Sequence, residues 1–248
     1  MQIRGNQLPL VLLIDLDDTI IDDSGNPATV ERLWRAACDE PAVLAGLDPD
    51  ALYQTIERYR TWYWADPERA RVGRADLRAA GAHFVDQALR TLGVADPGFA
   101  RRISDDYRDR RDAALCLLPG ALAALQAFVA RGCRLAMVTN GAASHQRAKI
   151  ARFGLDQYFA HIQIEGEFGV GKPAPEVYWH ALTQLGARPA DAWMVGDNLE
   201  ADVAAPQRLG IRGIWVDRYD DGLLPECGVH PDRVITALDQ LLPIAPSV

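Results

Sequence analysis

The chain has 248 residues and a formal net charge of −8 at pH 7, which argues against general attraction to nucleic acid or to an anionic membrane surface. Its four cysteines form no CxxC pair, so they do not indicate a zinc site. The N-terminal apolar run is too short to span a bilayer and lacks a signal-peptide cleavage site. These features predict a cytoplasmic globular protein without nucleic acid or membrane partners, and they do not indicate an oligomeric state.

Four short apolar segments have the character of strands buried on both faces of a parallel sheet. They are LVLLID (10–15), CRLAMVTN (133–140), DAWMVGDN (191–198) and IRGIWVD (211–217). Helices are expected between and after them, at 118–129, 142–153, 174–186 and 200–210, the last disturbed by Pro206. This alternation predicts an α/β fold, a Rossmann-like parallel sheet with helices on both faces.

Residues 23–115 break the alternation of strand and helix. Helices are expected at 28–38, 49–62, 75–92 and 98–113, and no segment resembles a buried strand. We interpret this part of the sequence as a helical domain inserted after the first strand. The predicted domains are therefore a core of residues 1–22 and 116–248 and a helical domain of residues 23–115.

Acidic residues follow two of the predicted strands, at the edge where open α/β sheets bind their ligands. Asp15 and Asp17 end the first strand, and their side chains would point the same way if the extended geometry continued. Together with Asp197 from a neighbouring strand end they would suit Mg²⁺, although an isolated DxD motif is more often a solvated loop. Asp18 would face away from Asp15, and we expect it to stabilise the turn.

Further polar residues at the strand ends suit an anionic ligand. Thr139, Asn140 and Gly141 precede a helix, so free N–H groups and a hydroxyl predict an anion site, with an ordinary helix cap as the alternative. Lys172 would add a positive point charge, although a lone lysine usually lies on the surface. A metal, a carboxylate nucleophile, anion donors and a cation are the parts needed for phosphoryl transfer through an aspartyl phosphate.

The segments DLDDT, VTNG, GKPAPEVY and VGDNLEAD resemble, in this order, the four motifs of the haloacid dehalogenase-like hydrolases. The resemblance covers nearly the whole core, and the helical insert resembles the family's cap of the first type. The second and third motifs look like those of the small-molecule phosphatases, a branch that includes N-acylneuraminate-9-phosphatase and the pyrimidine 5′-nucleotidases. The resemblance implies a magnesium-dependent phosphomonoesterase whose substrate is a small phosphate ester.

The resemblance also implies roles for particular residues. Asp15 would attack phosphorus, and Asp17 would protonate the leaving oxygen and then activate the hydrolytic water. Thr139 would bind a phosphate oxygen, and Lys172 would neutralise Asp15 and the transferring phosphoryl group. Asp197 would hold Mg²⁺ together with Asp15 and the backbone carbonyl of Asp17.

Two residues near the last motif would support the metal ligands, according to the same resemblance. Asp202 matches the supporting acid of that motif. Asn198 stands where many relatives carry a second acid, a serine or a threonine, and it could orient a metal-bound water.

In the helical insert, Trp64, Arg71 and Arg74 are candidates for recognising the leaving group of the substrate. Helix packing and a solvated basic face are the alternative interpretation of these residues. A cap of this kind would close over the substrate, exclude bulk water and select the leaving group.

Two other functions remain open from the sequence. A 2-haloacid dehalogenase would use Asp15 as its nucleophile but would need neither a metal nor Asp17. A phospho-accepting domain of the receiver type would not be an enzyme, but it would carry its phosphorylated aspartate on a later strand and would lack a large helical insert. The presence of Asp17, Asp197 and the insert favours the phosphomonoesterase.

Overall fold

The computed structural model of the chain separates into two compact units, which are described one at a time. The sheet unit comprises Met1–Asp22 and Cys116–Val248, and the helical unit comprises Asp23–Leu115. The structure describes residues 8–23, 27–220, 222 and 228–242, so Cys227 lies outside the described residues. No helix within these ranges is long and apolar enough to cross a membrane.

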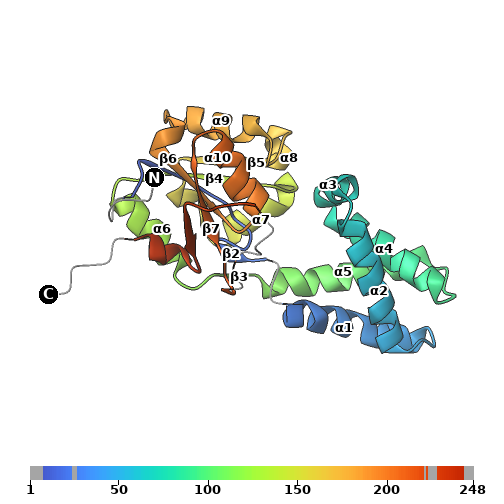
Figure 1. Cartoon of the computed structure of the whole chain (residues 1–248). Coiled ribbons are helices and arrows are strands. Elements are labelled where there is room, and N and C mark those ends of the chain that lie inside the picture. The colour runs from blue at the N-terminus through green and yellow to red at the C-terminus, as the bar shows by residue number, and fades with distance from the viewer. Residues whose placement is uncertain (1–7, 24–26, 221, 223–227, 243–248) are drawn as a thin grey trace. The chain divides into compact units, whose positions relative to one another are not determined.

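Among the described residues, the sheet unit is built on six parallel strands in the order β5-β4-β1-β6-β7-β8. These strands are β1 (Val11–Ile14), β4 (Arg134–Thr139), β5 (His161–Ile164), β6 (Ala192–Gly196), β7 (Arg212–Val216) and β8 (Arg233–Ile235). The strands β4, β5, β6 and β7 can be found by their labels in Figure 1. All four residues of β1 are buried, because this strand has a neighbour on each side and a packed layer on each face. The predicted α/β fold with a parallel sheet is confirmed.

Alternate residues of the central strands pack against different layers, which explains why their sequences are continuously apolar. Val11 and Leu13 of β1 share one apolar cluster with Tyr178 and Leu182 of a helix.

The helices of this unit are α6 (Ala121–Ala130), α7 (Ala143–Arg152), α8 (Glu165–Phe168), α9 (Pro175–Gln184) and α10 (Ala205–Arg208). The unit also has short 3₁₀ turns, η1 (Asp156–Tyr158), η2 (Pro189–Asp191) and η4 (Leu238–Leu241), and a π-helical turn, η3 (Leu199–Ala204).

Two features of the sheet unit differ from the sequence prediction. The strands β5 and β8 were not expected, because both are short and lie at or near the sheet edges. The helix expected over 200–210 begins as the π-helical segment η3, which continues directly into α10, and Pro206 is the second residue of α10. Ala204 and Ala205 both have αR backbone angles, so Pro206 lies within a continuous helical run, and a π-helical turn is a known way for a helix to accommodate such a local disturbance.

A second, two-stranded sheet flanks the insert in the sequence. Its strands, β2 (Ile21–Asp22) and β3 (Cys116–Leu117), pair antiparallel. The loop from β1 to β2 passes through Asp18, which has a positive φ of 56°, a conformation that aspartate adopts more readily than most residues.

The described residues of the helical unit form five helices around an apolar core of their own. They are α1 (Pro27–Leu44), α2 (Pro49–Trp64), α3 (Pro67–Ala75), α4 (Leu77–Thr91) and α5 (Pro97–Ala114). An aspartate side chain caps the first turn of each helix from α2 to α5, and proline follows the aspartate in three of the four cases. The Asp-Pro pairs thus set the helix starts by satisfying a free N–H and fixing φ. The helix α3 was not expected from the sequence.

Candidate active site

Lys172 joins two buried carboxylates at the carboxyl ends of the central strands. Its Nζ lies 2.8 Å from Oδ1 of Asp15 and 2.7 Å from Oδ1 of Asp202, and all three residues are buried. Burial alone would lower the pKa of Lys172, but the two carboxylates raise it above its usual value. The lysine is therefore charged at neutral pH and neutralises part of the acidic charge around Asp15.

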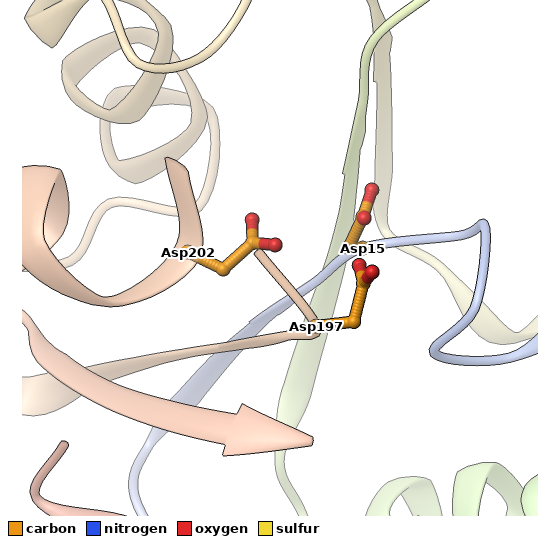
Figure 2. Close-up of side chains that lie close together, drawn as sticks. All are labelled: Asp15, Asp197 and Asp202. Carbon is orange, nitrogen blue, oxygen red and sulfur yellow. The ribbon is translucent and has the colours of Figure 1, made fainter. Parts of the chain in front are cut away.

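Three carboxylates from separate elements lie together at this edge of the sheet. Asp15 follows β1, Asp197 follows β6 and Asp202 lies in η3, and one oxygen of each lies within 4.8 Å of the others. Figure 2 shows the carboxylate of Asp202 directed toward the other two. The structure thus brings together the side chains of Asp15 and Asp197, two of the predicted metal ligands, whereas the side chain of Asp17, the third, is not part of this group.

The electrostatics of this cluster fit a divalent cation. Burial, with smaller contributions from Asp202 and Asp18, raises the pKa of Asp197 to about 7, and burial also raises the pKa of Asp15 well above its usual value. No ion pair to Asp197 is found among the described residues. Because oxygen ligands and excess negative charge are what Mg²⁺ requires, these residues fit that ion.

Asp202 is held in place by its surroundings and has no solvent-exposed surface. Besides its ion pair with Lys172, its Oδ2 accepts a hydrogen bond from the backbone N–H of Asn198 at 3.1 Å. Gly196 makes this packing possible, since a Cβ there would lie 2.2 Å from Oδ2 of Asp202. The side chain of Asn198 accepts hydrogen bonds from the N–H groups of Glu200 and Ala201, so it caps the turn that carries Asp202.

The carboxylate of Asp17 is bound by residues that the sequence analysis did not identify. Its Oδ1 lies 2.7 Å from Nζ of Lys149, and its Oδ2 accepts a 2.8 Å hydrogen bond from Nε2 of Gln146. The strand β1 ends at Ile14, so the extended geometry expected through Asp17 does not continue. As a result, Asp15 and Asp17 have different cationic partners.

The polar groups at the end of β4, from Thr139 to Gly141, were predicted as free anion donors, but in the structure they have partners within the protein. The hydroxyl of Thr139 lies 2.7 Å from Nε2 of Gln146, and the N–H of Gly141 donates to Oε2 of Glu165 at 2.9 Å. The side chain of Asn140 bonds to both backbone polar groups of Lys172, each at 2.7 Å. In this structure Asn140 therefore positions the lysine, and the N–H of Gly141 is occupied by a carboxylate.

Arg218 binds the turn that follows β1. Its Nη1 lies 2.7 Å from Oδ1 of Asp18, and its Nη2 lies 3.0 Å from Oδ2 of Asp22. This ion-pair network fits the expected turn-stabilising role of Asp18. The sequence offered no local signal for Arg218, because it is distant along the chain from both aspartates.

Two of the three specificity candidates, Arg71 and Trp64, have neighbours within the helical unit. Arg71 forms an exposed ion pair with Glu68 at 2.6 Å, and Trp64 packs against the apolar core of the unit. Arg74 lies in the last turn of α3. Recognition of a substrate by Trp64, Arg71 or Arg74 stays a prediction.

A sequence model of the haloacid dehalogenase-like hydrolases matches residues 10–210. The chain belongs to this family. It is 35% identical to a phosphoserine phosphatase of Thermus thermophilus, over 87% of this chain and 90% of that protein. It is 28% identical to a glyceraldehyde 3-phosphate phosphatase of Methanopyrus kandleri, with 85% of each chain covered. It is 27% identical to an N-acylneuraminate-9-phosphatase of Mus musculus, over 84% of this chain and 82% of that protein.

Solved structures show the same fold for this haloacid dehalogenase-like hydrolase. The hydrolase YfnB of Bacillus subtilis, determined with bound magnesium, superposes with a TM-score of 0.69 at 22% identity and covers 95% of this chain and 97% of its own. A 2-haloacid dehalogenase of Pseudomonas syringae gives a TM-score of 0.61 at 23% identity, over 94% of this chain and 96% of its own. The predicted family and the predicted class of enzyme, a hydrolase of the phosphatase branch, are confirmed.

Proposed function

We propose that this hydrolase is a magnesium-dependent phosphomonoesterase that hydrolyses a small phosphorylated metabolite through an aspartyl phosphate on Asp15. The observation that carries this proposal is the arrangement of Asp15, which has a buried lysine on one side and two further acids beside it. The named phosphatases among the relatives support the same reaction class. Cytoplasmic location and the absence of nucleic acid and membrane partners stay predictions from the sequence.

The proposed reaction has two in-line displacements at phosphorus. A carboxylate oxygen of Asp15 forms a bond to phosphorus while the ester oxygen leaves with the bonding electrons and takes a proton from Asp17. Water then attacks the aspartyl phosphate and gives its proton to Asp17, which releases Asp15 and inorganic phosphate. Lys172 stabilises the negative charge that both displacements place on the phosphoryl oxygens.

The metal ligands proposed for this chain are Asp15, Asp197 and the backbone carbonyl of Asp17, with Asp202 and Asn198 in support. A bound Mg²⁺ would supply positive charge opposite the phosphoryl oxygens. Both oxygens of Asp202 have partners, Lys172 and the backbone N–H of Asn198, whereas no ion pair to Asp197 is found among the described residues, so Asp197 is the better ligand for the cation. Thr139, at the end of β4, is proposed to contact a phosphate oxygen, since its hydroxyl accepts a hydrogen bond from Gln146 and can still donate its own hydrogen.

A panel of phosphate esters tests this function. Purified protein is assayed for phosphate release from phosphoserine, glyceraldehyde 3-phosphate and N-acylneuraminate 9-phosphate, first with Mg²⁺ and then with EDTA. We expect magnesium-dependent multiple turnover of at least one small ester. A stable phosphoprotein without turnover would instead support a phospho-accepting domain.

The dehalogenase alternative is favoured only by the fold that this chain shares with 2-haloacid dehalogenases. Dehalogenation would require neither Asp17 nor Asp197, the proposed ligand of the cation, whereas the proposed phosphomonoesterase reaction uses both. Chloride release from 2-chloropropionate in EDTA, without phosphate release from any ester, would replace the proposed function by this one.

The affinity for Mg²⁺ should depend on pH because Asp197 must be ionised to bind the cation. Its pKa is raised to about 7, so in the metal-free protein its neutral form favours folding at low pH, and this stabilisation is lost as the pH rises through 7. Bound Mg²⁺ requires the ionised form, and we therefore expect it to bind at least about tenfold more tightly near pH 8 than near pH 5.5.

Thermal unfolding with and without Mg²⁺ at the two pH values measures this effect, because a ligand of the native state raises Tm according to its affinity. The stabilisation by Mg²⁺ should be larger near pH 8 and should disappear in Asp197→Asn. An equal stabilisation at both pH values, or one that persists in Asp197→Asn, would contradict the prediction.

A further inference from the structure

Two side chains of the helix α7 contact Asp17, one at each of its carboxylate oxygens. Lys149 and Gln146 lie one turn apart on α7, so they present their polar groups on the same face. Nζ of Lys149 lies 2.7 Å from Oδ1 of Asp17, and Nε2 of Gln146 lies 2.8 Å from Oδ2. Donors at both oxygens fix the rotation of the carboxylate as well as its position.

The burial of the two donors is unusual for their residue types. The side chain of Lys149 is 3% exposed and that of Asp17 is 27% exposed, and Gln146 is 1% exposed. A lysine on a helix normally keeps its ammonium group in water, and burying that charge is unfavourable unless it is paired. The side chain of Lys149 is therefore directed away from water and toward Asp17.

Gln146 also connects Asp17 to the end of the neighbouring strand. The same Nε2 lies 2.7 Å from the hydroxyl of Thr139 and 2.9 Å from the backbone carbonyl of Asn140. An amide nitrogen has only two hydrogens for these three acceptors, so small movements of Gln146 redistribute its hydrogen bonds. Asp17, the proposed acid, and Thr139, the proposed phosphate contact, thus accept hydrogen bonds from the same Nε2 atom of Gln146.

We propose that Lys149 and Gln146 are positioning residues for Asp17, which hold its carboxyl group in the orientation needed to give a proton, in its acid form, to the leaving oxygen and to take one back from the attacking water. This inference rests on the proposed function, in which Asp17 transfers that proton. A merely structural attachment of α7 to the loop after β1 is the competing explanation. The two explanations differ in how the loss of either side chain should affect esters with good and poor leaving groups.

Protonation matters little when the departing oxygen is already a stable anion. Dinitrophenyl phosphate releases such an anion, whereas phenyl phosphate releases a far more basic oxygen that benefits from a well-placed acid. In the presence of Mg²⁺, we expect Lys149→Met and Gln146→Met to lower kcat/KM for phenyl phosphate about 30-fold and for dinitrophenyl phosphate less than about threefold. A defect in folding would lower both by the same factor.

Arg147→Met provides the matched control on the same helix. Arg147 forms a 2.7 Å ion pair with Glu167 on the exposed side of α7, so its replacement removes an ion pair without touching Asp17. We expect both esters to keep their wild-type kcat/KM within about twofold, since exposed ion pairs contribute little. Lys149→Arg keeps the charge but changes the geometry, and it should show a partial loss with the same preference for dinitrophenyl phosphate.

A double substitution tests whether Lys149 acts through Asp17. In the Asp17→Asn background, Lys149→Met should no longer change the ratio of the two kcat/KM values, because the group that it positions is gone. The inference would be overturned if Lys149→Met lowered kcat/KM equally for both esters. It would also be overturned if Lys149→Met still lowered kcat/KM selectively for phenyl phosphate in the Asp17→Asn background. If Lys149→Met does not fold, Lys149→Arg decides by the same ratio.

Failure of the inference is distinguishable from failure of the proposed function. Wild-type protein that hydrolyses neither these two esters nor any ester of the metabolite panel with Mg²⁺ would overturn the phosphomonoesterase function and this inference together. Wild-type protein that hydrolyses both esters, combined with variants that show no selectivity between them, would overturn the positioning role alone.

Discussion

Replacing Asp15 by asparagine should lower phosphate release by about 10⁴-fold or more. An amide is a far weaker nucleophile than a carboxylate, and the proposed reaction has no other group that can form the aspartyl phosphate. The fold should survive, because asparagine has nearly the same shape and Lys172 keeps its ion pair with Asp202. The measurement is phosphate release with Mg²⁺, together with mass spectrometry of rapidly quenched enzyme to detect the phosphoprotein.

The matched control for Asp15→Asn is Asp191→Asn. Asp191 also loses an ion pair, here with Arg188 at 2.7 Å, but it lies on the surface of the sheet unit. The control should retain wild-type turnover, and the mass of Asp15→Asn should be checked because deamidation would restore the aspartate. Comparable magnesium-dependent turnover in Asp15→Asn would remove Asp15 from its role as nucleophile.

Lys172→Met should lower both stability and turnover by large amounts. The lysine is 6% exposed and bridges Asp15 and Asp202, so its loss leaves two buried carboxylates without their cation. Breaking a buried pair on one side costs about 3–5 kcal/mol. Turnover should fall by about 10³-fold or more, because the charge that faces the phosphoryl group is removed.

The destabilisation caused by Lys172→Met should grow as the pH rises. Without the lysine, burial raises the pKa of Asp15 even further, so its neutral form is favoured in the folded protein and its ionisation at higher pH opposes folding. Denaturant unfolding near pH 5 and near pH 8 measures the difference. Arg188→Met serves as the control, since its exposed ion pair should not matter at either pH, and a loss of stability that is independent of pH would contradict the expectation.

Some parts of the site were predictable because local patterns encode them. Apolar runs that end in Asp15, Thr139 and Asp197 are sufficient to place these residues at strand ends, and parallel strands end at a common edge. The Asp-Pro pairs mark the helix starts of the insert because the side chain and the fixed φ act on the immediately following turn. The short strands β5 and β8 lack such a pattern and were missed.

Other parts depend on residues that are far apart in the sequence. Nothing near Asp17 indicates that Lys149 binds it, and the carboxylate of Glu165 meets the N–H of Gly141 only when β5 lies beside β4. By itself the sequence determined the family, the fold class and the set of strand-end residues, because motif order and hydrophobic periodicity are local properties. Only the tertiary structure decided which cation pairs with which carboxylate, because ion pairs form between groups that the fold brings within a few ångströms.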